Sequence, residues 1–133
     1  TIWDPHNKCH INQLEALQNR AARFITNDFR RYSSVTQMKS NISLESLESR
    51  RKINKAILFY KIQNNLVDVT LNLRQSAHFP GKFTQIQCRT TAYQRSFVPD
   101  SVVIWNTLST TATSSISLEA FKTSASSELI HLY

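Results

Sequence analysis

Apolar side chains recur at helical spacing along much of the chain, and their pattern divides it into short elements. One stripe predicts a helix from Asn12 to Ile25, and it consists of Ile11, Leu14, Leu17, Ala21, Phe24 and Ile25. Asn12 is a favourable N-cap and Glu15 stands three residues later, as in a capping box. Ser34, with Gln37 at the same spacing, predicts a second, short helix that ends near Asn41.

The longest predicted helix begins between Ser43 and Leu47, with Ser43 or Ser46 as its cap, and runs to Ile62. From Ile53 onward apolar side chains cover most of its circumference, which is typical of a helix in the middle of a core. A helix stop at Asn64-Asn65 and a turn at Pro80-Gly81 then indicate a long connection over residues 63–83.

The C-terminal part combines a predicted extended stretch with two further helices. Residues 84–98 are rich in Thr, Tyr, Phe and Ile, which favours one or two strands. A short helix is expected over 101–108, with Val102 and Trp105 facing inward, followed by a Ser/Thr-rich linker over 107–115. Ser117 should cap the last helix, with Ile116 packed onto Phe121 as a hydrophobic staple.

These elements predict a mainly α-helical fold: a small helical domain with a minor β element at about residues 84–98. A single glycine leaves little room for tight hairpins, which supports helices joined by polar loops. We expect a helical region over 1–66, a connection over 67–83 and a tail over 84–133, packed together as one domain. The aromatic residues expected to have structural roles are Phe24, Phe97, Trp105 and Phe121.

Charge adds a candidate function. Sixteen Lys and Arg face nine Asp and Glu, a net charge of +7 that attracts polyanions. Aromatic residues lie between the basic groups, a mixture that suits phosphate contacts combined with stacking on bases. Ordinary solvated helix faces are the alternative explanation. The residues expected to bind nucleic acid are Arg20, Arg23, Arg30, Arg31, Arg50, Arg51, Lys61, Arg89 and Arg95.

No pattern in the sequence indicates catalysis, a metal, a cofactor or a small-molecule substrate. A single glycine excludes a Gly-rich phosphate loop, and the acids are scattered. His6, Cys9 and His10 do not have the spacing of a standard zinc site, even with His78 and Cys88. Two cysteines indicate an intracellular protein rather than a disulfide scaffold, and no apolar run approaches the about 20 residues of a membrane span.

A series of short motifs then resembles one protein family over nearly the whole chain, in order from Trp3 to Lys122. The series includes Trp3-Asp4-Pro5, Leu14-Glu15, Gln18, Arg20-Ala21-Ala22-Arg23-Phe24-Ile25, Asp28-Phe29-Arg30, Ser33-Ser34-Val35-Thr36, Met38, Leu47-Glu48, Arg50-Arg51, Leu58, Tyr60-Lys61-Ile62, Val67-Asp68, Arg89-Thr90, Tyr93, Ser96-Phe97, Pro99, Trp105-Asn106, Leu108 and Leu118-Glu119-Ala120-Phe121-Lys122. It resembles the C-terminal region, the thumb and post-thumb tail, of reverse transcriptases of non-LTR (LINE-like) retrotransposons.

The resemblance implies a non-catalytic part of an RNA-directed DNA polymerase, because the metal-binding Tyr-x-Asp-Asp motif of the palm is absent here. The expected partners are template RNA, primer or target DNA, and the upstream palm, in the nucleus or a cytoplasmic ribonucleoprotein. A start at Thr1 also suggests a piece of a longer protein. The chain departs from the family at Thr91, where an Asp is common, at Asp100, where a basic residue is common, and at Ser109, where a Pro is common. It also has Ser43, Leu44 and Glu45 where the family often has Gly, an aromatic residue and Pro. The alternative is a structural or protein-interaction module, such as a decayed or domesticated remnant without nucleic-acid binding.

Overall fold

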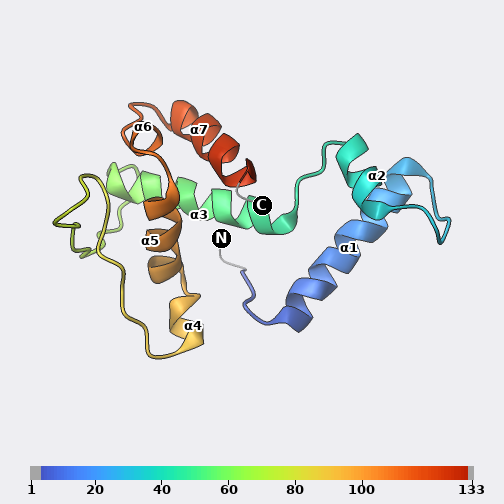
Figure 1. Cartoon of the computed structure of the whole chain (residues 1–133), viewed down its shortest axis with the longest axis horizontal. Helices are drawn as coiled ribbons and strands as arrows, with labels where there is room; N and C mark the ends of the chain where they lie inside the picture. The colour runs from blue at the N-terminus through green and yellow to red at the C-terminus, as the bar shows by residue number, and fades with distance from the viewer. Residues whose placement is uncertain (1–3, 132–133) are drawn as a thin grey trace. The chain divides into compact units, whose positions relative to one another are not determined.

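The computed structural model describes residues 4–131, which form a mainly helical fold, as the sequence predicted. Figure 1 shows the helices in chain order. The helices of this part of the chain are α1 (Lys8–Thr26), α2 (Val35–Asn41), α3 (Leu47–Gln63), α4 (Thr91–Gln94), α5 (Phe97–Thr107), α6 (Thr110–Thr113) and α7 (Leu118–His131). None of these helices is long and apolar enough to cross a membrane.

The chain divides into two compact units at Arg50 and Arg51, inside α3. We call residues 4–50 the N-terminal unit and residues 51–131 the C-terminal unit. The N-terminal unit contains α1, α2 and the first turn of α3. The C-terminal unit contains the rest of α3, the irregular segment 64–90 and α4 to α7.

The ends of α1 and α2 follow local capping signals. The α1 helix begins one turn earlier than predicted, because the Asn7 side chain, and not Asn12, caps it by accepting from the amide of Cys9 at 3.0 Å. Asn27 ends α1 in the left-handed conformation, with φ of 50°. Ser34 caps α2 as predicted, accepting from the amide of Gln37 at 3.4 Å.

The side of α1 that faces α2 is not the predicted apolar stripe. Gln18 and Ala22 of α1 and Met38 of α2 are buried. The Gln18 amide donates to the carbonyl of Glu45 at 2.8 Å, which fixes this side of the helix against the chain after α2. The stripe residue Phe24, which we predicted to be structural, is 78% exposed, and Leu17 and Ile25 are exposed as well.

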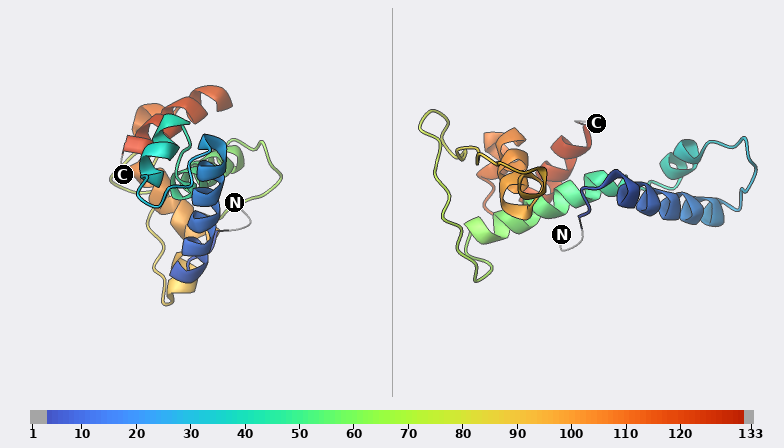
Figure 2. Two further views of the ribbon diagram at one scale, coloured as in Figure 1. Left: turned by 90° about the vertical axis from the view of Figure 1, so that its right-hand side faces the viewer. Right: turned by 90° about the horizontal axis from the view of Figure 1, so that it is seen from below.

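The core of the C-terminal unit is built around α3, as its all-round apolar surface predicted. Ser46 begins this helix by accepting from the amide of Ser49 at 3.0 Å. The right-hand view of Figure 2 shows α5 and α7 beside α3, and buried residues of all three helices belong to one cluster. The buried core residues are Ile53, Ala56, Phe59 and Tyr60 from α3, Val102, Ile104 and Trp105 from α5, Leu108, Ala112 from α6, and Phe121, Ala125 and Leu129 from α7.

Aromatic rings join the three main helices of this core. Tyr60 stacks on Phe121 with ring centroids 4.3 Å apart, and Trp105 stacks on Phe121 at 5.7 Å. Phe59 packs against Trp105 at 5.1 Å. Trp105 and Phe121, both predicted to be structural, are therefore buried, and Phe97 packs half-buried against the same cluster. Offset aromatic contacts of this kind add about 0.5–1.5 kcal/mol each beyond the burial of their area.

The predicted strands over 84–98 do not form. The segment contains α4, which Thr90 caps, and the only isolated β-bridge among residues 4–131 pairs Gln75 with Phe83. The Asn106 side chain makes two hydrogen bonds with the backbone of Phe83, as the backbone of a neighbouring strand would in a sheet. It accepts from the amide of Phe83 at 3.0 Å and donates to the carbonyl of the same residue at 2.8 Å. The backbone of Phe83 is thus satisfied without a sheet.

The last two helices also differ in part from the prediction. A short α6 forms inside the expected Ser/Thr linker, where Ser109 caps it by accepting from the amide of Ala112 at 3.1 Å. Ser117 caps α7 as predicted, accepting from the amide of Ala120 at 3.2 Å. The Ile116 side chain is fully exposed, so the predicted staple onto Phe121 is wrong. Stacking on Tyr60 and Trp105 buries Phe121 instead.

Candidate nucleic-acid interface

The predicted basic residues of the N-terminal unit fall into two groups. Arg20, Arg31 and Arg50 are exposed, and within residues 4–131 their side chains make no hydrogen bond or ion pair. Arg23 and Arg30 are engaged by the loop that follows α1. Only the first group is free to contact a phosphate without breaking an existing interaction.

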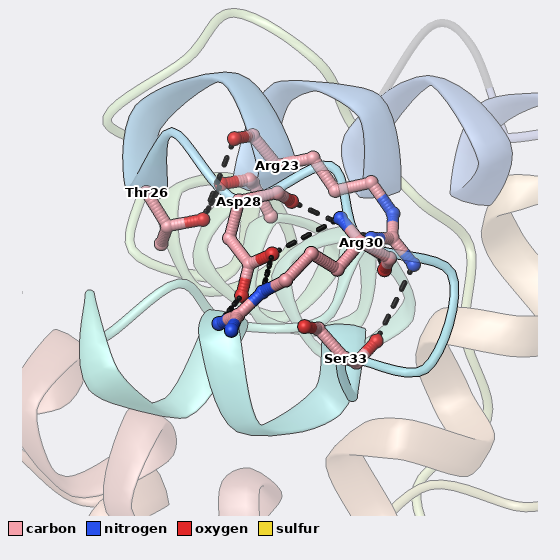
Figure 3. A network of polar contacts seen from close by, with 6 residues as sticks. Arg23, Thr26, Asp28, Arg30 and Ser33 are labelled. Carbon is pink, nitrogen blue, oxygen red and sulfur yellow. Dashed lines mark hydrogen bonds and ion pairs between the residues drawn. The ribbon is translucent and has the colours of Figure 1, made fainter.

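Arg23 was expected to bind nucleic acid, but its side chain is half-buried and already hydrogen-bonded within the N-terminal unit. The guanidinium donates to three backbone carbonyls of the loop 27–33: Arg30 at 2.9 Å, and Asp28 and Ser33 at 3.4 Å each (Figure 3). Five donors in a rigid fork allow one arginine to bind several carbonyls together. Arg23 therefore fastens the loop to α1.

Asp28 and Arg30 reinforce the same loop from within (Figure 3). The Asp28 carboxylate accepts from the backbone amide of Arg30 at 3.0 Å and from its guanidinium at 3.0 Å and 2.9 Å. The hydrogen bonds from the Arg30 side chain, with further ones from Ser33 and the Arg30 backbone, hold the pKa of Asp28 well below its ordinary value. The same pairing raises the pKa of Arg30. Arg30 also lies 5.6 Å from the centre of the exposed Tyr32 ring.

The predicted basic residues of the C-terminal unit are placed differently. Arg89 and Arg95 are exposed and Lys61 is half-buried, and these three side chains make no hydrogen bond or ion pair within residues 4–131. Arg51 is half-buried and has an interaction partner in the structure. Arg74 is a further exposed arginine without a side-chain partner in the same range. Sequence reasoning missed it because it stands alone in the irregular segment.

Asp100, one of the positions where the chain departs from the resembled family, forms an ion pair with a buried lysine. Its carboxylate lies 2.5 Å from the ammonium of Lys55, whose side chain is only 4% exposed. Asp100 comes from the first turn of α5, where a negative charge also complements the helix dipole. The acid thus neutralises a lysine in the core of the C-terminal unit.

Another feature that the sequence did not indicate is an apolar hollow of about 440 Å³ in the N-terminal unit. It is lined by Leu17, Arg20, Ala21, Arg23, Phe24 and Phe29. The pattern suggested that Leu17, Ala21 and Phe24 were core residues, but α2 packs on a different side of α1. An exposed apolar surface next to arginines can bind either a base or another protein.

Among residues 4–131, no group of three or more His, Cys, Asp or Glu side chains is gathered as a metal ion requires. Cys9 and Cys88 are free cysteines. A comparison with models of protein families gives no match, and comparisons with curated proteins and with solved structures give none either.

Proposed function

We propose that this chain binds nucleic acid without catalysing a reaction, as the C-terminal part of a non-LTR retrotransposon reverse transcriptase. The observation that carries the proposal is the set of predicted basic side chains with no partner within residues 4–131. They are Arg20, Arg31, Arg50, Lys61, Arg89 and Arg95. Their charges are available to phosphates because no acid of the described chain neutralises them.

The role that follows is to hold template RNA, primer or target DNA for a catalytic palm elsewhere in the parent protein. The ordered motifs from Trp3 to Lys122 support this assignment. It places the chain inside the cell, in the nucleus or in a cytoplasmic ribonucleoprotein. Phosphate contacts carry no base information, so this binding tolerates any sequence.

A salt titration tests the proposal. Fluorescence anisotropy should detect binding of the whole chain to a generic RNA oligonucleotide and to duplex DNA. The logarithm of affinity should fall linearly with the logarithm of salt concentration, by about 0.7 per contact for single strands and about 0.9 for duplex DNA. Replacing Arg20 or Arg31 by Ala should each remove about one phosphate contact and reduce the slope by the share that one contact supplies.

Lys122→Ala provides the matched control. It removes one positive charge, but Lys122 is already paired with Glu119 at 2.8 Å. The salt slope of this variant should equal that of the unchanged chain. Absence of binding at low salt, or binding that responds neither to salt nor to the arginine substitutions, would discard the nucleic-acid role.

A structural or protein-interaction module is the second candidate, and the placement of Arg23 favours it. The guanidinium of this arginine is partly exposed but is already hydrogen-bonded to carbonyls of the loop 27–33, so it is not free to bind a phosphate. If the other basic residues also served only the fold and its solubility, the salt titration would show no binding. The two candidates therefore give opposite results in one experiment.

A further inference from the structure

The apolar hollow of the N-terminal unit is lined by apolar side chains and by two arginines. Leu17, Ala21 and Phe24 contribute from α1, and Phe29 contributes from the loop 27–33. Phe24 is 78% and Phe29 65% exposed, so both rings present much of their surface to solvent. Arg20 also lines the hollow and has no side-chain partner within residues 4–131.

The backbone on both sides of Phe29 is held by hydrogen bonds. The carbonyls of Asp28 and Arg30, on either side of it, both accept from Arg23. The Asp28 carboxylate then binds the backbone amide and the guanidinium of Arg30. A backbone held in this way loses little conformational freedom when a ligand contacts the Phe29 ring, which favours binding.

Charge selects between the possible occupants. Four arginines and one acid lie between residues 17 and 32, and the acid, Asp28, is already bound by Arg30. A base of a single strand brings both an apolar face for the rings and a phosphate for Arg20. A base within a duplex is already stacked between its neighbours and cannot offer a free face to this hollow.

We propose that the hollow binds an unpaired base of single-stranded RNA or DNA, stacked on Phe24 or Phe29, with Arg20 on an adjoining phosphate. The inference rests on the proposed nucleic-acid function and adds a preference for single strands. Stacking on the two phenylalanines should contribute affinity that does not depend on salt concentration. The contact of Arg20 with a phosphate should contribute affinity that falls as salt concentration rises.

The test uses the whole chain, a 15-nucleotide oligouridine and an RNA duplex of the same strand length. The oligouridine should bind more tightly than the duplex at equal salt. Phe24→Ala and Phe29→Ala should each lower affinity for oligouridine by about 5- to 100-fold if a base stacks on that ring, and at least one of them must do so. The salt slope and the affinity for the duplex should not change.

Phe79→Ala is the matched control, because Phe79 is 67% exposed and lies outside the N-terminal unit. It should leave both affinities unchanged, and circular dichroism should show that each variant keeps its helices. Three results would overturn the inference and leave the proposed nucleic-acid function in place, provided that salt-dependent binding is still observed. The phenylalanine variants could lose affinity for single strands and duplex equally, or neither variant could lose affinity. Alternatively, the variants could change only the self-association of the chain. Absence of any binding removes the proposed function and this inference together.

Discussion

The indole Nε1 of Trp105 donates a hydrogen bond to the backbone carbonyl of Gly81 at 3.0 Å. The next two residues are tied to the same end of α5. Lys82 donates its ammonium to the carbonyls of Leu108 and Trp105, and Phe83 exchanges two hydrogen bonds with the Asn106 side chain. Three consecutive residues thus attach the irregular segment 64–90 to the C-terminal end of α5.

Trp105 should therefore contribute to stability in two separable ways. Trp105→Phe keeps an aromatic ring in the core but loses the bond to Gly81, and should lower the free energy of unfolding by about 1–2 kcal/mol. Trp105→Ala also leaves a cavity beside Phe59 and Phe121, and should cost about 3–5 kcal/mol. Urea unfolding followed by circular dichroism measures both. Equal losses for the two variants would contradict the separate role of the hydrogen bond.

The buried pair of Lys55 and Asp100 should be sensitive to removal of one partner. Asp100→Asn takes the carboxylate away from a buried ammonium and should lower the free energy of unfolding by about 3 kcal/mol. The double variant Lys55→Met, Asp100→Leu should recover most of that loss, because neither charge is then buried. Glu119→Gln, which breaks the surface pair with Lys122, should cost no more than about 1 kcal/mol. Thermal and urea unfolding of the three variants test this ranking.

Replacing Arg23 by Lys should loosen the loop 27–33 and leave the C-terminal unit unchanged. A lysine ammonium cannot reproduce the guanidinium fork that reaches the carbonyls of Asp28, Arg30 and Ser33. Hydrogen bonds to a charged group contribute about 1.5–3 kcal/mol, so amide exchange in the loop should accelerate at least about tenfold. Hydrogen–deuterium exchange with mass spectrometry measures it. Arg20→Lys is the control and should leave the loop's exchange rate unaltered.

Acid should weaken the loop through Asp28. Its folded pKa lies below the ordinary value of about 3.9, chiefly because of the hydrogen bonds from Arg30. The stabilising contribution is therefore complete above about pH 5, where Asp28 is ionised in both the folded and the unfolded chain, and it is lost as the pH falls toward the folded pKa. The difference in free energy of unfolding between the unchanged chain and Asp28→Asn should be constant from pH 7 to about pH 5 and shrink below about pH 4. Urea titrations across this range would contradict the assignment if the difference grew in acid.

The N-caps of α2, α3 and α7 were accessible from sequence, although the cap of α1 was not. Ser34, Ser46 and Ser117 each cap a helix at or within the predicted positions. A cap depends on residues within three positions of one another, so its signal is contained in a short stretch of chain. The central place of α3 was also predictable, because a helix that is apolar all round must be buried.

Features set by residues distant in sequence were not predictable in the same way. The inward side of α1 depends on Gln18 reaching Glu45, 27 residues away, and no periodicity within α1 reveals that contact. The strand-like composition of 84–98 did not reveal that no strand among residues 4–131 would lie beside this segment to pair with it. Arg23 binds backbone carbonyls, which every residue carries, so its partners leave no trace in the sequence.

The same limit applies to the candidate site. Arg20 could be predicted as exposed because it lies off the predicted apolar stripe of its helix and has no acid three or four residues away. The hollow between Phe24 and Phe29 could not, since it exists only where the loop 27–33 returns along α1. Sequence reasoning therefore identified the charges but not the apolar surface beside them.

Gly81, the acceptor for Trp105, has φ of +73°, yet a Cβ built on it would meet no atom within 4 Å. A side chain at position 81 would have enough space, but the positive φ is unfavourable for an L residue. The position is therefore selective for chirality and not for side-chain volume. An L-alanine would be strained there, whereas a D-alanine, introduced by chemical ligation, prefers this mirror-image conformation. Because the D residue also narrows the conformations of the unfolded chain, the substitution should raise stability by about 0.4–1 kcal/mol. L-alanine and D-alanine at position 81 differ only in chirality, yet the first should weaken and the second should strengthen the attachment of this segment to Trp105.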